Sequence, residues 1–224
     1  MKAMTERHLA ILRRHMVEII DMHYDLNSDE IGREAPDADL RRALLEVPRH
    51  LFVPDPLAAY AYQDTPLPIG FDKTLSQPFI GALMLDLLQV KPGQRVLEVG
   101  TGLGYQAAVL AELGASVYSV EVVEEFALAA SARLAALGHH VEIRTGDGSR
   151  GWAEHAPFDR ILVTAAASET PQALLDQLAP DGRIIIPLGG EEVQQLCVVQ
   201  RDGARDIKGQ PVMLVRFTRL ETAI

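Results

Sequence analysis

RVLEVGTGLGY, from Arg95 to Tyr105, is the stretch from which the architecture of this chain follows most directly. Its first five residues alternate between apolar and polar and include β-branched valines, which predicts a strand that feeds a parallel sheet. The strand breaks at Gly100, Gly102 and Gly104, which let the backbone turn tightly and let a ligand lie on the main chain, because no Cβ intervenes. Residues 106–112 are predicted to form a helix whose free amide groups point back at the turn.

Two acidic residues sharpen the interpretation of this turn as a nucleotide site. Glu98 lies inside the first predicted strand, and Glu121 ends a second strand-like run over residues 115–120. A carboxylate at the end of that strand accepts both hydroxyls of a ribose in nucleotide-binding folds. The alternative for Glu121 is an acid that is solvated at a strand end. The glycine spacing argues against a nicotinamide oxidoreductase, because the dinucleotide fingerprint has its third glycine one residue later than Gly104.

The remainder of the chain continues the alternation of strand and helix. Helices are predicted over residues 123–137, closed by Gly138 as a C-cap, and 171–178; strands are predicted over 141–145, 159–164, 183–187, 194–200 and 211–217, the last two joined by a hairpin-like link at 201–205. This order predicts an α/β fold, a Rossmann-like doubly wound sheet of about seven strands with helices on both faces and a C-terminal antiparallel hairpin. Asp147, between two glycines after the strand at 141–145, is a candidate to hold an exocyclic amine, with a turn acid as the alternative.

The first third of the chain is predicted to be a helical and extended addition to this core. A helix capped by Thr5 continues to about residue 22, a second helix covers 39–46, and the prolines between 48 and 78 favour extended, ordered connections. Thr74 and Ser76 precede a helix over residues 78–88, and the simplest role for either hydroxyl is to cap that helix.

Three histidines, His8, His15 and His23, recur near one face of the first helix. Their separations of seven and eight residues are too long for two ligands of one metal ion. A solvated helix face is therefore the prediction for all three, and no metal site is expected.

Composition and charge limit the classes of function. A chain of 224 residues with 48% hydrophobic and 23% charged residues is predicted to form one globular domain, with residues 1–78 as an N-terminal and lid extension and 79–224 as the core. The net charge of −10 argues against a nucleic-acid binder. The single cysteine, Cys197, stands in an apolar run and is expected to be buried and inert. No apolar stretch has the length of a bilayer span, and the charged N-terminus differs from a signal peptide, so we expect a cytoplasmic protein, as a monomer.

The glycine turn, Glu121, the Gly-Asp-Gly turn at 146–148 and the C-terminal hairpin together resemble class I methyltransferases that use S-adenosylmethionine. Within that superfamily, the sequence is most similar to protein-L-isoaspartate O-methyltransferases. The similar segments are 47–54 (VPRHLFVP), 74–78 (TLSQP), 96–111, 146–148, 151–152, 156–159, 164–167, 171–178 and 186–189. The resemblance implies methyl esterification of L-isoaspartyl residues in damaged proteins and peptides, which initiates their repair.

The resemblance also implies roles for individual residues. In the family, a Thr-Ile-Ser segment ahead of the central fold closes over the cofactor, and its serine is usually marked as the active site; Ser76 is its counterpart by position. The implied contacts with S-adenosylmethionine are Thr74, Leu75, Gln77, Glu98, Gly100, Thr101, Gly102, Gly104, Glu121, Asp147, Gly148 and Thr164. Among these, residues 98–104 would face the methionine end, Glu121 the ribose, and Asp147 with Gly148 the adenine.

Three departures from the family pattern leave alternatives open. Residues 71–73 (FDK) stand where small residues and a glutamine are common, Leu103 replaces a small residue, and Phe217 is followed by Thr218 and Arg219 instead of Val-Pro. The first and third departures are expected where the family holds its peptide. One alternative is therefore a carboxyl methyltransferase that acts on an aspartate of a dedicated peptide. An alternative from another class is a non-catalytic binding module that has kept the fold.

Overall fold

The computed structural model describes residues 5–202 and 206–222 of the chain. Its α-helices are α1 (Glu6–Leu26), α2 (Ser28–Ile31), α3 (Ala38–Glu46), α4 (Pro78–Leu88), α5 (Tyr105–Glu112), α6 (Glu124–Ala136) and α7 (Gln172–Asp176). Its strands are β1 (Leu67–Gly70), β2 (Lys73–Leu75), β3 (Arg95–Val99), β4 (Ser116–Glu121), β5 (Val141–Thr145), β6 (Phe158–Val163), β7 (Leu178–Gly189), β8 (Gln194–Asp202) and β9 (Asp206–Val215). Short 3₁₀ helices cover Arg49–Phe52, Asp55–Tyr60, Gly148–Arg150 and Ala153–His155.

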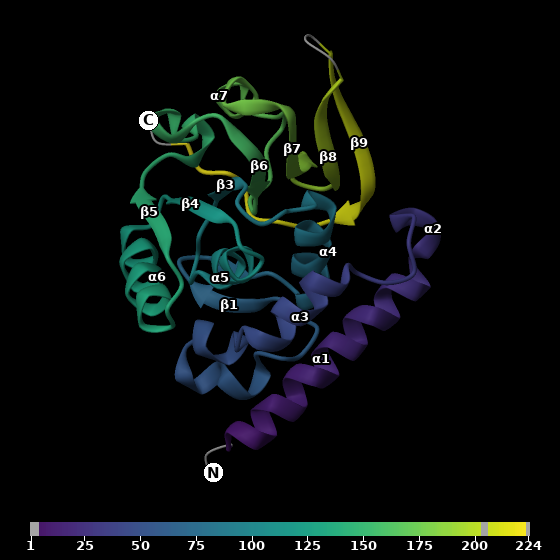
Figure 1. Cartoon of the computed structure of the whole chain (residues 1–224), viewed down its shortest axis with the longest axis vertical. Helices are drawn as coiled ribbons and strands as arrows, with labels where there is room; N and C mark the ends of the chain where they lie inside the picture. The colour runs from purple at the N-terminus through teal and green to yellow at the C-terminus, as the bar shows by residue number, and fades with distance from the viewer. Residues whose placement is uncertain (1–4, 203–205, 223–224) are drawn as a thin grey trace.

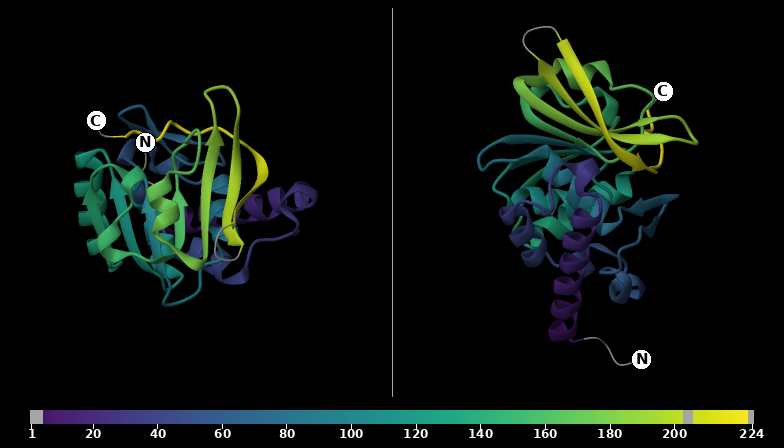
Figure 2. Two further views of the ribbon diagram at one scale, coloured as in Figure 1. Left: turned by 90° about the horizontal axis from the view of Figure 1, so that it is seen from above. Right: turned by 90° about the vertical axis from the view of Figure 1, so that its right-hand side faces the viewer.

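A seven-stranded sheet in the order β5-β4-β3-β6-β7-β8-β9 forms the centre of the molecule (Figures 1 and 2). The first five of these strands pair in parallel, whereas β8 is antiparallel to both β7 and β9. The chain order reverses at β3, with β4 and β5 on one side and β6 on the other, which creates a topological switch point. The predicted doubly wound sheet with an antiparallel C-terminal hairpin is confirmed.

Alternate residues of β3 belong to two hydrophobic layers on opposite faces of the sheet. Val96 packs in the layer that contains α4, α5 and the inner faces of α1, α3 and α6. Leu97 and Val99 pack in the other layer, with α7 and the inner face of β7. Burial on both faces explains why this strand is apolar on both sides and why its one carboxylate, Glu98, is inaccessible to solvent.

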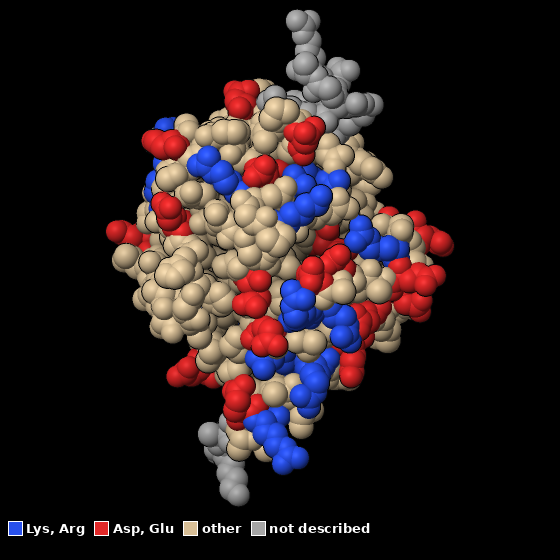
Figure 3. Space-filling model, viewed as in Figure 1, with Lys and Arg blue, Asp and Glu red and all other residues tan. Residues whose placement is uncertain are grey.

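Helix α1 leans away from the sheet, and its N-terminal end lies farthest from it (Figures 1 and 2). Thr5 caps it as predicted, but the helix ends at Leu26 rather than near residue 22, because its buried stripe continues from Ile20 to Tyr24. Acidic and basic side chains are mixed over its outer face (Figure 3). No helix within residues 5–202 and 206–222 combines the length and the hydropathy that crossing a bilayer requires.

The predicted solvated face holds for two of the three histidines on α1. His8 and His15 are exposed, but the side chain of His23 is only 30% exposed. Its Nε2 lies 2.8 Å from Asp64 Oδ2, and its ring stacks on the ring of Phe79. The prediction was wrong for His23 because its partners come from distant parts of the sequence.

The proline-rich segment contains a β-hairpin that the sequence analysis did not predict. β1 and β2 pair antiparallel, with Leu67 opposite Leu75 and Gly70 opposite Lys73. The two residues of the turn, Phe71 and Asp72, have φ values of 50° and 54°, as the central residues of a type I′ turn do. Asn-Gly is the usual sequence signal for such a turn. Because Phe-Asp stands at this position, the hairpin could not be predicted from the sequence.

Several boundaries in the C-terminal half differ from the prediction, and β7 is longer at both ends than the predicted range of 183–187. Helix α7 ends at Asp176, because β7 already begins at Leu178 and pairs there with Phe158. Strand β9 begins at Asp206 and includes Pro211, which an edge strand tolerates next to the irregular pairing opposite Cys197. Cys197 itself is buried, as expected. Residues 203–205 of the predicted link lie outside the described residues.

Candidate active site

The glycine turn between β3 and α5 has the conformation that its glycines predict. Gly100, Gly102 and Gly104 have φ values of 94°, 53° and 92°. A Cβ on Gly100 would lie 2.5 Å from Thr164 Oγ1, so the turn accommodates no side chain there. The Thr164 hydroxyl donates to the Gly100 carbonyl at 2.8 Å, which ties the turn to the end of β6.

Glu121 at the end of β4 holds the same turn from the other side. Its Oε2 accepts a hydrogen bond from the Gly102 amide at 2.7 Å, and its Oε1 accepts one from the Val123 amide at 3.0 Å. The carboxylate therefore fixes the turn and the start of α6. Each oxygen keeps a second lone pair, so this carboxylate can accept further hydrogen bonds from a ligand.

Glu98 forms a buried polar chain beneath the turn. Ser119 Oγ donates to Glu98 Oε2 at 2.5 Å, and Thr101 Oγ1 lies 2.5 Å from Ser119 Oγ. Burial raises the pKa of Glu98 to about 8, and the hydrogen bond from Ser119 opposes this shift. Glu98 Oε1 has no hydrogen-bond partner within the described part of the chain, which is costly for a buried oxygen. This unpaired oxygen next to the glycine turn is available for a hydrogen bond with the polar end of an amino-acid ligand.

A cleft with an empty volume of about 570 Å³ opens at the carboxyl edge of the sheet; we call it the glycine-turn cleft. The ends of the strands, the turns after them and the start of α6 contribute Val99, Gly100, Gly102, Val120, Glu121, Val122, Phe126, Gly148, Thr164 and Ala165; the hairpin contributes Ile69, Lys73 and Thr74; the C-terminal segment contributes residues 218–221. This segment crosses the ends of β3 and β6 (Figure 1) and pairs with the chain at Ala166. An ion pair between Lys73 Nζ and Glu221 Oε1 joins the hairpin to it.

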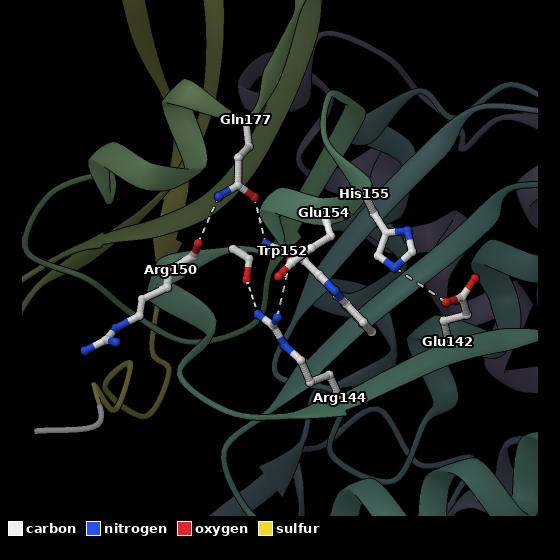
Figure 4. Close-up of polar contacts among 8 residues, drawn as sticks. Glu142, Arg144, Arg150, Trp152, Glu154, His155 and Gln177 are labelled. Carbon is white, nitrogen blue, oxygen red and sulfur yellow. Dashed lines mark hydrogen bonds and ion pairs between the residues drawn. The ribbon is translucent and has the colours of Figure 1, made fainter.

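The turn at Asp147 and Gly148 is braced from outside the cleft. Asp147 Oδ1 accepts hydrogen bonds from the Ser149 amide at 2.9 Å and the Ser149 hydroxyl at 2.6 Å. The Gln177 side chain donates a hydrogen bond to the Arg150 carbonyl and accepts one from the Trp152 amide (Figure 4). Arg144 donates a hydrogen bond to the carbonyl of Gly151, between these two residues. A Cβ on Gly148 would lie 2.3 Å from Val99 Cγ1, so the turn lies against β3. Asp147 thus shapes its own turn, and a contact between Asp147 and adenine stays a prediction.

A second hollow, with an empty volume of about 850 Å³, lies beside the hairpin; we call it the Ser76 groove. Its walls are Pro66, Thr74, Ser76, Gln77, Ile80 and residues 214–217. Thr74 lines both hollows, so they meet at this residue. The prediction that Thr74 or Ser76 caps α4 was wrong, because Gln77 is the N-cap and the cap has no side-chain hydrogen bond. The Ser76 hydroxyl has no hydrogen bond within the described part of the chain.

The residues that the resemblance singled out lie in five places. The glycine-turn cleft is lined by Thr74, Gly100, Gly102, Glu121, Gly148 and Thr164. Glu98, Thr101 and Leu75 are buried next to it, and Gly104 begins α5. Ser76 and Gln77 face the Ser76 groove, and Asp147 holds its turn. Four residues of the site were not predicted from the sequence: Ser119, Ile69, Phe126 and Glu221. Among them, only Phe126 had a signal, because it lies on the helix that follows Glu121.

The departures from the family pattern also have definite positions. Lys73, Thr218 and Arg219 line the glycine-turn cleft, and none of them is among the described residues that line the Ser76 groove. Leu103 is buried, and its carbonyl accepts a hydrogen bond from Arg133. Phe71 at the hairpin tip packs edge-on against Phe126, with ring centroids 5.3 Å apart. The departures therefore change the cover of the cleft rather than the wall of the groove.

Comparison with known proteins agrees with this geometry. The model of the protein-L-isoaspartate(D-aspartate) O-methyltransferase family matches residues 29–223. A protein-L-isoaspartate O-methyltransferase 1 of Polaromonas sp. is 47% identical over 221 residues, which cover 98% of this chain and 94% of that protein. A solved structure of a protein-L-isoaspartate O-methyltransferase superposes with a TM-score of 0.79 at 28% identity, covering 92% of this chain and 65% of that one.

A second solved structure comes from Plasmodium falciparum. It is described as a protein-L-isoaspartate O-methyltransferase in complex with S-adenosyl-L-homocysteine, and it superposes with a TM-score of 0.74 at 25% identity, covering 92% of this chain and 99% of that one. The unpaired oxygen of Glu98, the glycine turn and the Glu121 carboxylate fit an adenosyl amino acid. The chain therefore belongs to the protein-L-isoaspartate(D-aspartate) O-methyltransferase family, whose members use S-adenosylmethionine to methylate isoaspartyl carboxylates.

Proposed function

We propose that this chain esterifies the free carboxylate of L-isoaspartyl residues at the junction of its two hollows. The cofactor would occupy the glycine-turn cleft and the isoaspartyl segment the Ser76 groove. The observation that carries this assignment is Thr74, which lines both hollows and directly precedes the segment that contains Ser76. A methyl donor and an acceptor can meet only where the two sites adjoin.

The chemistry asks little of the protein beyond alignment. Bound S-adenosylmethionine would supply a methyl group on a sulfonium, which is a good leaving group. The acceptor carboxylate is ionised at neutral pH, so neither a protein nucleophile nor a general base is needed. The residues around the junction have to align the carboxylate in line with the methyl group and exclude water.

Ser76 would be the residue that orients the acceptor. Its hydroxyl lies in the wall of the groove and is free to donate to a carboxylate oxygen. A hydrogen bond to a charged group contributes about 1.5–3 kcal/mol, which is enough to select one orientation. On the cofactor side, Glu98 and the glycine turn would hold the amino-acid end, Glu121 the ribose, and Gly148 with Asp147 the adenine.

The biological outcome that we propose is repair of aged proteins in the cytoplasm. In this family the product ester closes by itself to a succinimide, which opens in part to normal aspartate. We expect the chain to act as a monomer on flexible peptide segments and not on nucleic acid. The net charge of −10 and the mixture of charges on its surface support the last point (Figure 3).

The departures from the family pattern do not favour a dedicated peptide substrate. That alternative depended on altered residues in the acceptor site, whereas Lys73, Thr218 and Arg219 line the glycine-turn cleft. A generic isoaspartyl hexapeptide should therefore be methylated in strong preference to its aspartyl twin.

Substitution of Ser76 by alanine tests the assignment. We expect Ser76→Ala to reduce kcat/KM for the isoaspartyl hexapeptide by about tenfold or more, since one charged hydrogen bond is lost. Its affinity for S-adenosylhomocysteine, measured by calorimetry, should be unchanged. Ser131→Ala, on the exposed face of α6, is the matched control and should retain full activity. A wild-type rate in Ser76→Ala would refute the role of the hydroxyl.

A further inference from the structure

One carboxylate, that of Asp64, holds the chain immediately after Ser76. Asp64 Oδ1 accepts a hydrogen bond from the Phe79 amide at 2.9 Å, and Oδ2 accepts one from Gln77 Nε2 at 2.7 Å. The side chain of Asp64 is only 11% exposed. These bonds fix the first turn of α4, and so they fix the direction from which Ser76 enters the groove.

A buried cation holds the same segment from the other side. Arg49 is 2% exposed, and its Nη2 donates to the carbonyl of Ser76 at 2.6 Å. Its Nε donates to the carbonyl of Ala61 at 2.8 Å. Ser76 is therefore held by main-chain and side-chain contacts on both flanks, while its own hydroxyl remains free.

The third polar contact of Asp64 is with a residue of α1. His23 Nε2 lies 2.8 Å from Asp64 Oδ2, and the His23 ring stacks on Phe79 with centroids 4.6 Å apart and an interplanar angle of 20°. His23 thus contacts both the carboxylate that holds the segment and a residue that the carboxylate holds. Helix α1 precedes residues 29–223, the part of the chain that the family model matches.

We propose that His23 is a positioning residue for the methyl acceptor, acting through Asp64 on the segment that carries Ser76. The inference rests on the proposed role of Ser76. Without the contact from His23 Nε2, Asp64 Oδ2 would keep only Gln77, and α4 could begin in more than one position. Displacement of an orienting group by about 1 Å can cost two orders of magnitude in rate.

Other contacts keep α1 in place, which makes the role of His23 separable from helix docking. Val17, Ile20 and Tyr24 are fully buried, and Asp21 forms an ion pair with Arg41 at 3.0 Å. A change confined to the His23 ring therefore leaves the helix attached. Asp21→Asn serves as the matched control. It removes a polar contact between the same helix and Arg41, and among the described residues neither member of that pair bonds to Asp64 or Phe79.

Two variants separate the contact with Asp64 from the ring stacking. His23→Phe keeps a ring against Phe79 but removes the nitrogen that contacts Asp64, whereas His23→Gln removes the ring but offers an amide N–H to Asp64. We expect His23→Phe to reduce kcat/KM for the isoaspartyl hexapeptide by about tenfold, because loss of the close polar contact with Asp64 loosens the segment that carries Ser76. His23→Gln should recover most of this activity, and Asp21→Asn should match the unmodified chain.

The second readout does not depend on catalysis. Hydrogen exchange measured by mass spectrometry should be faster over residues 77–81 in His23→Phe, and unchanged there in His23→Gln and Asp21→Asn. The affinity for S-adenosylhomocysteine should be the same in all of them. An active His23→Phe beside an inactive His23→Gln, or equal weakening of cofactor binding, would overturn the proposal. If Ser76→Ala is fully active while exchange in His23→Phe is fast, the role of Ser76 fails and the positioning by His23 stands.

Discussion

The two hollows of this enzyme are built in different ways. One wall of the glycine-turn cleft is the continuous stretch that joins β3 to α5, and its shape depends on main-chain conformation at Gly100 and Gly102. The segment that carries Ser76 is held by Arg49 and Asp64, which bond to it directly, and by His23, which contacts Asp64; the three residues are distant from one another in the sequence. Cofactor binding can thus rely on a local motif, whereas acceptor binding relies on tertiary contacts.

The largest effect that tests this contrast is expected from the addition of a single methyl group at Gly100. Gly100→Ala combines a left-handed backbone with a Cβ placed 2.5 Å from Thr164 Oγ1, so we expect a loss of about 3 kcal/mol in the free energy of unfolding. Binding of S-adenosylhomocysteine should be lost. Urea unfolding and calorimetry measure the two effects.

Gly138→Ala is the control for this prediction, because φ is +80° there and no atom lies within 4 Å of the added Cβ. It should cost about 1 kcal/mol from the backbone alone and leave cofactor binding intact. Hydrogen exchange over residues 77–81 should be unaffected in both variants. Faster exchange there in Gly100→Ala would show that the two hollows are not built independently.

An intermediate effect is expected in the pH dependence of stability. The pKa of Glu98 is raised from 4.5 to about 8 in the folded protein by burial. Between these values the unfolded chain loses the proton while the folded chain retains it, so this group makes the free energy of unfolding fall as pH rises from about 4.5 to about 8 and then level off. Glu98→Gln should lack this component of the fall.

Urea unfolding at several pH values between these limits measures the difference between the two proteins. Glu112→Gln, an exposed acid at the end of α5, is the matched control and should keep the fall. If the free energy of unfolding changed with pH in the same way in Glu98→Gln and in the unmodified chain, the raised pKa of Glu98 would be contradicted.

The smallest effect is expected at the ion pair that joins the walls of the cleft. Lys73→Met removes the contact with Glu221, whose side chain is 55% exposed, so the free energy of unfolding should change by less than about 1 kcal/mol. Release of S-adenosylhomocysteine should become a few-fold faster, because the hairpin and the C-terminal segment cover the cleft together. Stopped-flow displacement measures this rate.

Arg41→Met breaks a comparable, partly exposed pair between α3 and α1 and should leave the release rate unchanged. Added salt should accelerate release from the unmodified chain and have less effect on Lys73→Met, because salt screens the same pair. An identical salt dependence in the two proteins would show that the pair does not influence the rate of cofactor release.

The sequence was sufficient for the parts of the molecule whose structure depends on neighbouring residues. β3 and β5 have the predicted bounds, and α4 spans its predicted range, because apolar periodicity and the flanking glycines and prolines are local signals. The place of Glu121 beside the glycine turn also followed from the fold, since parallel strands end at one edge of the sheet.

The remainder depends on contacts across the sequence. Ser119 looks like any polar residue of a strand until β3 brings Glu98 beside it. In the sequence alone, His23 resembles a surface histidine, because its contact with the distant Asp64 is not visible there. The residue types of Phe71 and Asp72 do not indicate a turn either. These features were missed because a partner residue, not a local pattern, gives each of them its role.

Thr74 has a consequence for the relation between the two binding sites. A residue that forms part of two walls can couple the occupancy of one hollow to that of the other, and thermodynamic linkage requires any such effect on affinity to be equal in both directions. If bound cofactor raises the affinity for peptide by some factor, bound peptide must raise the affinity for cofactor by the same factor. The two ligands would then stabilise each other through the wall that they share.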